Sequence, residues 1–556
     1  MYWPRCRGLH NIARRAAIMP GIREKGLSIV RAVLYRLLAW LGRHPLVLIV
    51  LPSLWLLVRY HPFWKDVDAV AQLLAAAGVS NILHCPPGYC FLGRVPFQVV
   101  GMLTHGSAPG IFGEQAPSLL SVQLLVFCQH VGLWASLRYL LFSVAWSDVR
   151  RGMATVLLAS VASFYTFAHT AGSEAVTAVT WIAVFGSGLR ILLWPSVKVS
   201  WVIYAAALWL AIGSRTVNNV LLLWLPATIA CIVGYQLLRK GDRSSINLHL
   251  RHGLFAVVAG TGVFGAEKVL VSLLCHRFSI IERSTDGATF SDRIGTLVAT
   301  LPGEQKAKIR AAALALARSP GVRAAIEAQF EFISYHLGGY AEIERFLYQQ
   351  GWRGEELAAE QDRVTLEATL CLYRAAPRQL VPLIAKEFAR TWATSDYRIA
   401  RAGPFATFQF VRSLALAKVG GQPPSYLDLP DPLSMLDAVD ADLVISHWEN
   451  IPLIVWFSVF LSIGIARRLR RAISQRLFFL ALSFVAFGAV ADLAACVFAY
   501  AQPRYTLPLL VGVFASGGVL LFGSDRRKER LDVSAQAEAS GVQKPVFKTE
   551  SAAINK

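Results

Sequence analysis

The sequence predicts an all-α integral membrane protein with about ten transmembrane helices and an α-helical domain outside the membrane. Three observations support this prediction. The residues AVILMFWYC make up 55% of the 556-residue chain and charged residues only 16%, whereas soluble domains have about 25% charged residues. Long apolar windows recur along the chain, and basic residues cluster beside them. A formal net charge of +20 that is distributed in this way is typical of membrane topology, so no nucleic acid is expected as a partner.

Each predicted span is an apolar window of about 20 residues, which crosses a hydrocarbon core of about 30 Å. The ten windows begin near Pro45, Leu119, Met153, Ala175, Trp201, Val220, Leu254, Ile451, Leu477 and Leu507. They divide the chain into a basic N-terminal arm (1–44), seven spans (45–276) with a first outer loop (60–117), an outer domain (277–450), three spans (451–524) and a tail (525–556). The tail has no apolar period and is expected to be disordered.

Basic residues follow every even-numbered span. They are Arg150 and Arg151; Arg190 and Lys198; Arg239, Lys240, Arg243 and Arg251; and Arg467, Arg468, Arg470, Arg471 and Arg476. Short loops rich in Lys and Arg stay in the cytoplasm, so both termini are predicted there and 277–450 on the outer side. Abundant Arg and Ala, together with the absence of any Asn-x-Ser/Thr sequon, favour a bacterial inner membrane.

The outer stretch 277–450 has helical periodicity. In GEQKAKIRAAALALA and PRQLVPLIAKEFART, apolar residues recur every three or four positions, which indicates amphipathic helices. A passive cap or dimer contact and a role in acceptor recognition are both compatible with this pattern.

The eight cysteines form no repeated CxxC pair and no His/Cys cluster with zinc spacing, so no structural zinc site is expected. Cys85 and Cys90 flank a Pro-Pro-Gly-Tyr turn in the first outer loop. Four intervening residues allow a disulfide across this turn, and two thiols are the equal alternative.

The first outer loop contains more than a connector between spans needs. Asp66 and Asp68 lie about one turn beyond the first span, before the apolar run AVAQLLAAAG. Capping of a helix is the structural interpretation of these acids. A carboxylate that takes a proton from a hydroxyl group is the functional one.

Further polar residues are predicted at the same membrane face. His169 and Glu174 fall in the outer turn between spans three and four, Arg215 at the outer end of span five, and Arg504 at the start of span ten. Each alone is explained as an interfacial anchor or a solvated turn residue. Together, an acid and facing arginines that bind a phosphate by their fork geometry are what glycosyl transfer from a lipid phosphate requires.

This layout resembles the GT-C superfamily of polyprenol-dependent membrane glycosyltransferases, including aminoarabinose transferases and protein mannosyltransferases. Their acidic first-loop motif and the Pro-Gly-Tyr-Pro segment that follows are matched by 66–70 and by CPPGYC at 85–90. FLGRVPF resembles the start of their loop-closing helix, and FAHTAGSEA, GSRTVNN and QPRYTLPLL resemble their outer turn and Arg-bearing spans. Val70 replaces the usual aromatic residue and Val67 the usual Glu, which leaves the choice between Asp66 and Asp68 open.

The resemblance implies a sugar donated from an undecaprenyl- or decaprenyl-phosphate carrier to a glycan, lipid or protein acceptor on the outer side, with inversion. It implies Asp66 as general base with Asp68 in reserve, and Arg215 and Arg504 as partners of the lipid phosphate. His169, Glu174, Tyr89 and Tyr505 would line the substrate pocket. No cofactor is required by the pattern. Some superfamily members use a divalent cation, for which oxygen ligands would indicate Mg²⁺ or Mn²⁺.

Two other functions remain open at this point. An O-antigen ligase or polymerase would use groups of the long outer stretch, among them His336, Arg398, Arg401 and His447. A transporter of lipid-linked sugars would show paired halves with broken helices. Within the spans, Lys268 and Asp492 are predicted to form an ion pair between helices, because ionisable groups at that depth need partners. Their alternative role is to line the lipid-phosphate groove together with Glu267.

Overall fold

A computed structural model describes most of the chain. The described residues are 29–65, 82–83, 88–105, 118–144, 146–194, 198–239, 243–278, 281–282, 301–331, 339–393, 405–406, 432–445, 450–498 and 503–523. Asp66, Asp68, Cys85 and the tail 525–556, all subjects of the predictions above, lie outside these residues.

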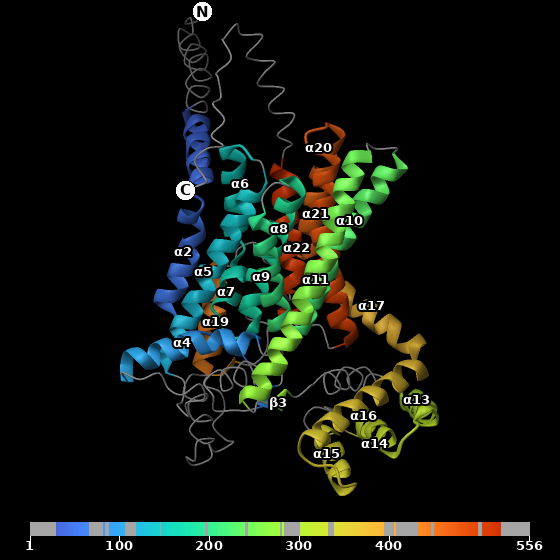
Figure 1. The fold of residues 1–556 in the computed structure, drawn as a ribbon. Coiled ribbons are helices and arrows are strands. Elements are labelled where there is room, and N and C mark those ends of the chain that lie inside the picture. Colours follow the sequence, from blue (N-terminus) through green and yellow to red (C-terminus); the bar gives the residue numbers. More distant parts are fainter. Residues whose placement is uncertain are drawn as a thin grey trace, which may run out of the picture.

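The protein is an all-α membrane protein, as the sequence predicts. A helix occupies each predicted apolar window (Figure 1): α2 (Leu46–Arg59), α5 (Leu119–Ser143), α6 (Asp148–Ala159) with α7 (Ala162–Ala168), α8 (Ser173–Leu193), α9 (Val199–Ser214), α10 (Leu221–Leu238), α11 (Arg243–Phe278), α20 (Leu453–Leu469), α21 (Gln475–Phe498) and α22 (Pro503–Phe522). A further helix, Ile29–Arg43, precedes α2 at a bend of 76°. It occupies part of the segment predicted to be an N-terminal arm.

Not all of these helices are long enough to cross a bilayer alone. Among the described residues, five are long and apolar enough to span, or six if the bent pair Ile29–Arg43 and Leu46–Arg59 counts as one. Others are shorter: α9 has 16 residues and α20 has 17. The third window is divided between α6 and α7 at Ser160, whose hydroxyl donates to the Leu157 carbonyl. Helix lengths therefore explain why fewer single-helix spans occur than windows.

Side-chain chemistry accounts for the starts and the packing of these helices. Ser118 and Ser147 accept hydrogen bonds from the backbone N–H of Ser121 and Arg150, which caps α5 and α6. Helix α8 runs through the centre, and its Phe185 stacks on Phe484 of α21 with ring centroids 4.3 Å apart. A Cβ at Gly188 would lie 2.2 Å from the Trp224 ring, so only glycine lets α8 and α10 approach this closely.

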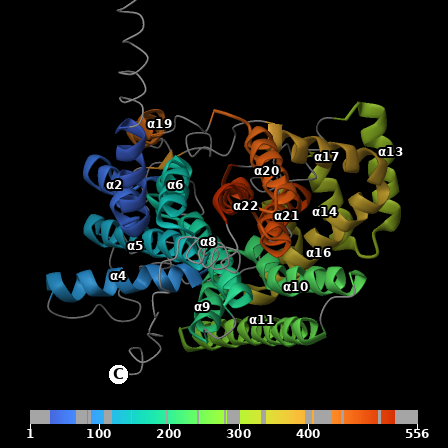
Figure 2. The same ribbon diagram turned by 90° about the horizontal axis from the view of Figure 1, so that it is seen from above.

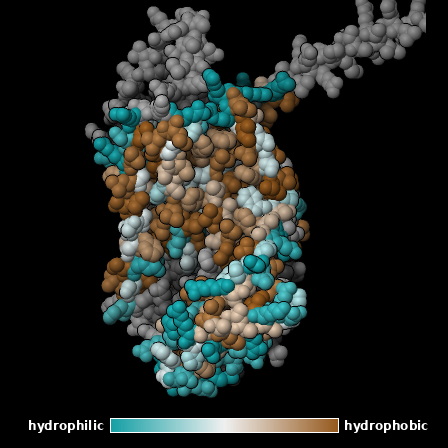
Figure 3. All heavy atoms as spheres, turned by 90° about the vertical axis from the view of Figure 1, so that its right-hand side faces the viewer, coloured by the Kyte–Doolittle hydropathy of each residue, from teal (hydrophilic) through white to brown (hydrophobic). Residues whose placement is uncertain are grey.

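The surface of the bundle matches a membrane environment. Figure 3 shows an apolar belt with hydrophilic residues at both ends. On α11, Leu254, Phe255 and Val258 are all exposed apolar residues, as expected for side chains that face lipid rather than water.

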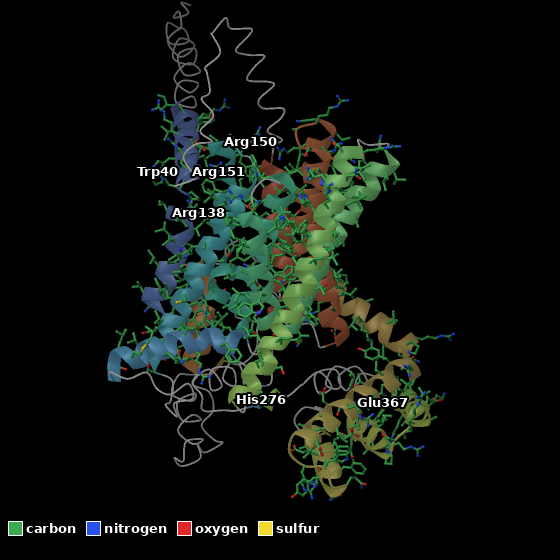
Figure 4. All side chains as sticks on the ribbon, in the orientation of Figure 1. Trp40, Arg138, Arg150, Arg151, His276 and Glu367 are labelled. Carbon is green, nitrogen blue, oxygen red and sulfur yellow. The ribbon has the colours of Figure 1, made fainter. Side chains whose placement is uncertain are left out.

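The two ends of the bundle differ in chemistry. Arg150 and Arg151 lie at one end, and the connections α10–α11 and α20–α21 lie at the same end (Figures 1 and 4). We call this the basic end. At the opposite end, the domain end, lie His276 of α11 and the helical domain that contains Glu367. The basic connections and the helical domain thus lie at opposite ends of the bundle.

The helical domain consists of α13 (Gly303–Leu316), α14 (Pro320–Glu331), α15 (Tyr340–Gln349), α16 (Gly354–Ala375) and α17 (Pro377–Ala393). It has its own core, which includes Val322, Ile326, Val364 and Leu372. Hydrogen bonds attach the domain to α21. The Tyr373 hydroxyl donates to the Val497 carbonyl, and Thr391 Oγ1 donates to Asp492 Oδ2 at 2.5 Å.

Short contacts also tie the loops of the domain end together. Strand β1 (Trp64–Lys65) pairs antiparallel with β4 (Phe405–Ala406), and β2 (Ile82–Leu83) pairs parallel with β3 (Ile281–Glu282). Helix α19 (Pro432–Ile445) packs on α7, and the Tyr60 hydroxyl donates to Asp440 Oδ2 at 2.5 Å. The first outer loop is therefore joined to the long outer stretch by main-chain pairing.

Candidate active site

A buried ion pair lies at the domain end of the bundle. Arg215 Nη1 is 3.2 Å from Glu174 Oε1, and the two side chains are only 11% and 6% exposed. Glu174 is in the first turn of α8, where the helix dipole favours a negative charge. Arg215 directly follows α9 in extended backbone, with φ −155° and ψ 137°. The structure thus brings together two residues that the sequence placed separately at this face.

Asn218 maintains the backbone turn that presents Arg215. Its amide nitrogen donates to the Ala211 carbonyl at 2.8 Å, and its amide oxygen accepts from Trp181 Nε1 at 2.8 Å. These bonds tie the 3-10 helix η1 (Thr216–Val220) to α9 and α8. The sequence alone does not point to Asn218. The available signal is an amide residue in the polar segment GSRTVNN, just after the predicted end of a span.

Helix α4 (Gly88–His105) covers this region from the side. It lies across the domain end, at a large angle to the bundle helices (Figure 1), and it includes the predicted FLGRVPF helix. A Cβ at Gly88 would lie 2.4 Å from the Gly213 carbonyl oxygen, so the start of α4 contacts the end of α9 directly. Only glycine allows that approach.

Tyr89 anchors α4 through α5. Its hydroxyl donates to Gln129 Oε1 at 3.0 Å, and Gln129 Nε2 donates to the carbonyls of Ala168 and Thr170 at 2.9 and 3.0 Å. Burial, together with the nearby charge of Glu174, raises the pKa of Tyr89 well above its ordinary value. The phenol is therefore a neutral hydrogen-bond donor near Glu174 rather than a proton-transfer group.

His169 belongs to a buried hydrogen-bond chain. Its Nε2 lies 3.1 Å from the His61 carbonyl oxygen and its Nδ1 lies 3.2 Å from His130 Nε2. His130 Nδ1 is 2.9 Å from Ser53 Oγ, which accepts from Trp134 Nε1 at 2.7 Å. Burial lowers the pKa of His169 from 6.5 to about 4, so the imidazole is neutral near pH 7.

In this series of hydrogen bonds, the donor and the acceptor of each bond follow from which atoms can donate a proton. A carbonyl only accepts, so His169 carries its proton on Nε2, and its Nδ1 must accept from the Nε2–H of His130. His130 Nδ1 then accepts from the Ser53 hydroxyl. Both ring nitrogens of His169 are therefore hydrogen-bonded, and its side chain holds the backbone of the first loop at His61.

The start of the first outer loop is fixed against the α7–α8 turn. The Phe63 N–H donates to the His169 carbonyl at 3.0 Å, and the Ala171 N–H donates to the Phe63 carbonyl at 2.9 Å. The segment 61–63 is thus bound to the turn that leads into Glu174. The described segment ends at Lys65, one residue before Asp66.

The remaining predicted residues have different outcomes. Helix α22 begins at Pro503, but the side chains of Arg504 and Tyr505 lie outside what the structure describes. The same is true of His336, Arg398, Arg401 and His447. Within the described residues, no group of three or more His, Cys, Asp or Glu side chains is arranged to hold a metal ion.

The predicted Lys268–Asp492 ion pair is wrong. Lys268 Nζ lies 3.9 Å from Glu267 Oε2 and its side chain is 56% exposed, whereas Asp492 accepts from Thr391 of the helical domain. Hydropathy places both residues in spans but does not determine which way each helix is rotated. Glu267 instead packs beside Gly213, where an added Cβ would lie 3.7 Å from its Oε1, close to the Arg215 turn.

No protein-family profile and no curated protein matches the chain. Among solved structures, the chain is similar to the oligosaccharyltransferase AglB of Archaeoglobus fulgidus, in complex with an inhibitory peptide and a dolichol-phosphate, with a TM-score of 0.40, 13% identity and coverage of 91% of this chain and 52% of AglB. It is also similar to ArnT of Cupriavidus metallidurans bound to undecaprenyl phosphate, with a TM-score of 0.28, 14% identity and coverage of 90% of this chain and 80% of ArnT.

The chain spans about half the length of AglB. At these identities and TM-scores the likeness concerns the fold alone and assigns no role to any residue of this chain.

Proposed function

We propose that this protein transfers a sugar from a polyprenyl-phosphate carrier to an acceptor at the domain end of the bundle. The observation that supports this proposal is the buried Glu174–Arg215 pair, placed where α4, the α7–α8 turn and the end of α9 meet. By the positive-inside rule, the basic end faces the cytoplasm and this site the periplasmic side of a bacterial inner membrane.

The proposed role of Arg215 is to bind the lipid phosphate. A guanidinium has five N–H donors in a planar fork, so pairing with one carboxylate is compatible with a contact to a phosphate. Glu174 orients the fork, and the low exposure of both side chains strengthens their electrostatic interactions with an anion. Arg504, from the start of α22, is the proposed second partner of the phosphate.

The proposed chemistry is a single displacement with inversion. The acceptor hydroxyl oxygen forms a bond to the anomeric carbon while the bond from that carbon to the phosphate oxygen breaks. The phosphate leaves with the electron pair, and a first-loop carboxylate takes the hydroxyl proton. Asp66 is the proposed base, with Asp68 in reserve. The pairing of residues 61–63 with the 169–171 turn supports this choice because it anchors the start of that loop at the site.

His169 and Tyr89 are proposed as positioning residues. His169 binds the His61 carbonyl and Tyr89 binds Gln129, so each fixes one wall of the region around Glu174. Tyr505 remains a proposed pocket residue at the start of α22.

Binding of undecaprenyl phosphate to the full chain tests the proposal. Arg215→Lys should weaken binding by about tenfold or more, because an ammonium group cannot reproduce the bidentate fork. Arg239→Lys, at the basic end, is the matched control and should bind normally. Equal affinity of native protein and Arg215→Lys would contradict the proposed phosphate site.

A further inference from the structure

An apolar groove lies between α6 and α20 over α22, and its lining includes none of the candidate active site residues. Its walls include Met153, Val156 and Leu157 of α6, Ser160 just after α6, Trp456 of α20 and Phe514 of α22, and its volume is about 250 Å³. Viewed from above, α22 lies between α6 and α20 (Figure 2). Val156 is 43% exposed, so the groove is open on this side.

Aromatic packing shapes the floor of the groove. Trp456 stacks on Phe460 with centroids 5.6 Å apart and lies 5.8 Å from the Phe514 ring. A Cβ at Gly517 would lie 2.5 Å from the Phe460 ring, so this glycine lets α20 seat its ring on α22. The Ser160 hydroxyl donates to the Leu157 carbonyl, so it does not need a hydrogen-bond acceptor on a molecule bound in the groove. The lining therefore suits a hydrocarbon chain.

Two arginines lie on the helix faces that line the groove, toward the basic end. Arg150 precedes Met153 by three residues, so both are on one face of α6. Arg467 follows Trp456 by eleven residues, about three helical turns, and so lies on the same face of α20. The charges of Arg150 and Arg467 interact with each other. Arg467 also donates to the carbonyls of Leu520 and Gly523 at 2.6 Å each.

The spacing of cations and groove corresponds to one lipid leaflet. Arg150 and Ser160 are ten residues apart on α6, a rise of about 15 Å, and half of a hydrocarbon core is also about 15 Å. Two neighbouring guanidinium groups create a positive potential that attracts an anion. A hydrocarbon chain below and an anion above are the two parts of an anionic phospholipid.

We propose that this groove binds an anionic phospholipid of the leaflet at the basic end. One acyl chain lies along Trp456 and Phe514, and the phosphate lies between Arg150 and Arg467, where arginine forks bind phosphate oxygens. Basic pockets between transmembrane helices are known to select anionic head groups. The site is independent of the proposed transfer reaction, since it uses none of its residues.

Native mass spectrometry of the full chain in detergent tests this site with three probes: dioleoyl phosphatidylglycerol, dioleoyl phosphatidylcholine and inorganic phosphate. Phosphatidylglycerol should bind tightest. Arg150→Gln and Arg467→Gln should each weaken its binding about fivefold, and the double variant about 25-fold. Arg239→Gln, at the same end but away from the groove, is the control and should bind as the native protein does.

A second pair of variants tests the acyl chain. Ser160→Phe fills the deep part of the groove and should lower phosphatidylglycerol binding, whereas Val202→Phe, on an exposed face of α9, should not. The proposal is overturned if the two lipids bind equally, if inorganic phosphate binds as tightly as phosphatidylglycerol, or if both Ser160→Phe and Arg150→Gln bind phosphatidylglycerol like the native chain.

Discussion

His130 Nε2 lies 3.2 Å from His169 Nδ1, and this contact joins α5 to the α7–α8 turn inside the protein. Polar groups in a membrane-embedded helix are costly unless they find partners. Here Trp134, Ser53, His130, His169 and the His61 carbonyl satisfy one another in sequence. This series of hydrogen bonds therefore holds α2, α5 and the first outer loop in one arrangement. It does so only while the imidazoles of His130 and His169 are both neutral.

Acid should destabilise the protein through His169. Its folded-state pKa lies near 4, below the ordinary 6.5, so between these values the unfolded chain binds a proton that the folded chain does not. The contribution of His169 to the free energy of unfolding is then fully present above about pH 6.5. It is lost as the pH drops toward 4, by up to about 3 kcal/mol. Thermal unfolding in detergent at pH 7.5 and 5 should show this loss. His169→Gln should flatten the dependence, whereas the exposed His44→Gln should not. An unchanged slope in His169→Gln would exclude His169 as its source.

Removing the Ser53 hydroxyl should leave two buried groups without their bonds. Ser53→Ala removes the donor to His130 Nδ1 and the acceptor of Trp134 Nε1, so we expect a loss of about 1 to 3 kcal/mol in unfolding free energy. Ser458→Ala removes only an exposed bond to Ile454 and should be nearly neutral. Similar melting temperatures for the two variants would show that the buried hydrogen bonds of Ser53 add no stability.

Breaking the Glu174–Arg215 pair should cost more than removing it. Glu174→Gln leaves a buried guanidinium without its carboxylate, which typically destabilises by about 3 to 5 kcal/mol. Adding Arg215→Gln should restore part of that loss, because the uncompensated charge is gone. Unfolding of both single variants and the double variant measures the coupling. Additive losses would mean that the two side chains act independently.

Asp66→Asn should abolish most sugar transfer while the protein remains folded. Loss of a general base typically lowers turnover by about 10²- to 10⁴-fold, and Asp68→Asn should be milder. Transfer rates and undecaprenyl phosphate binding should be measured together, since binding should change little. Glu304→Gln, an exposed acid of the helical domain, is the control. Native turnover in the Asp66/Asp68 double variant would reject a first-loop base.

Hydropathy and charge predict the coarse architecture without any tertiary information. Apolar windows locate the helices because a helix that faces lipid must be apolar over its length. Clusters such as Arg150 and Arg151 mark one end of the bundle because charges remain outside the hydrocarbon. Residue type and the alternation of spans are enough to place Glu174 and Arg215 at one membrane face.

The tertiary structure decided which side chains meet. The sequence predicts an ion pair between Lys268 and Asp492, but helix rotation turns Lys268 outward and places Asp492 against Thr391. The sequence does not point to His130 or Asn218, although each is a polar residue in or next to a predicted span. Such a residue reveals that it needs a partner but not which partner it has. The partners are Ser53 and His169 for one and Trp181 for the other. They come from helices distant in the chain, and only the packing of those helices brings donor and acceptor within hydrogen-bond distance.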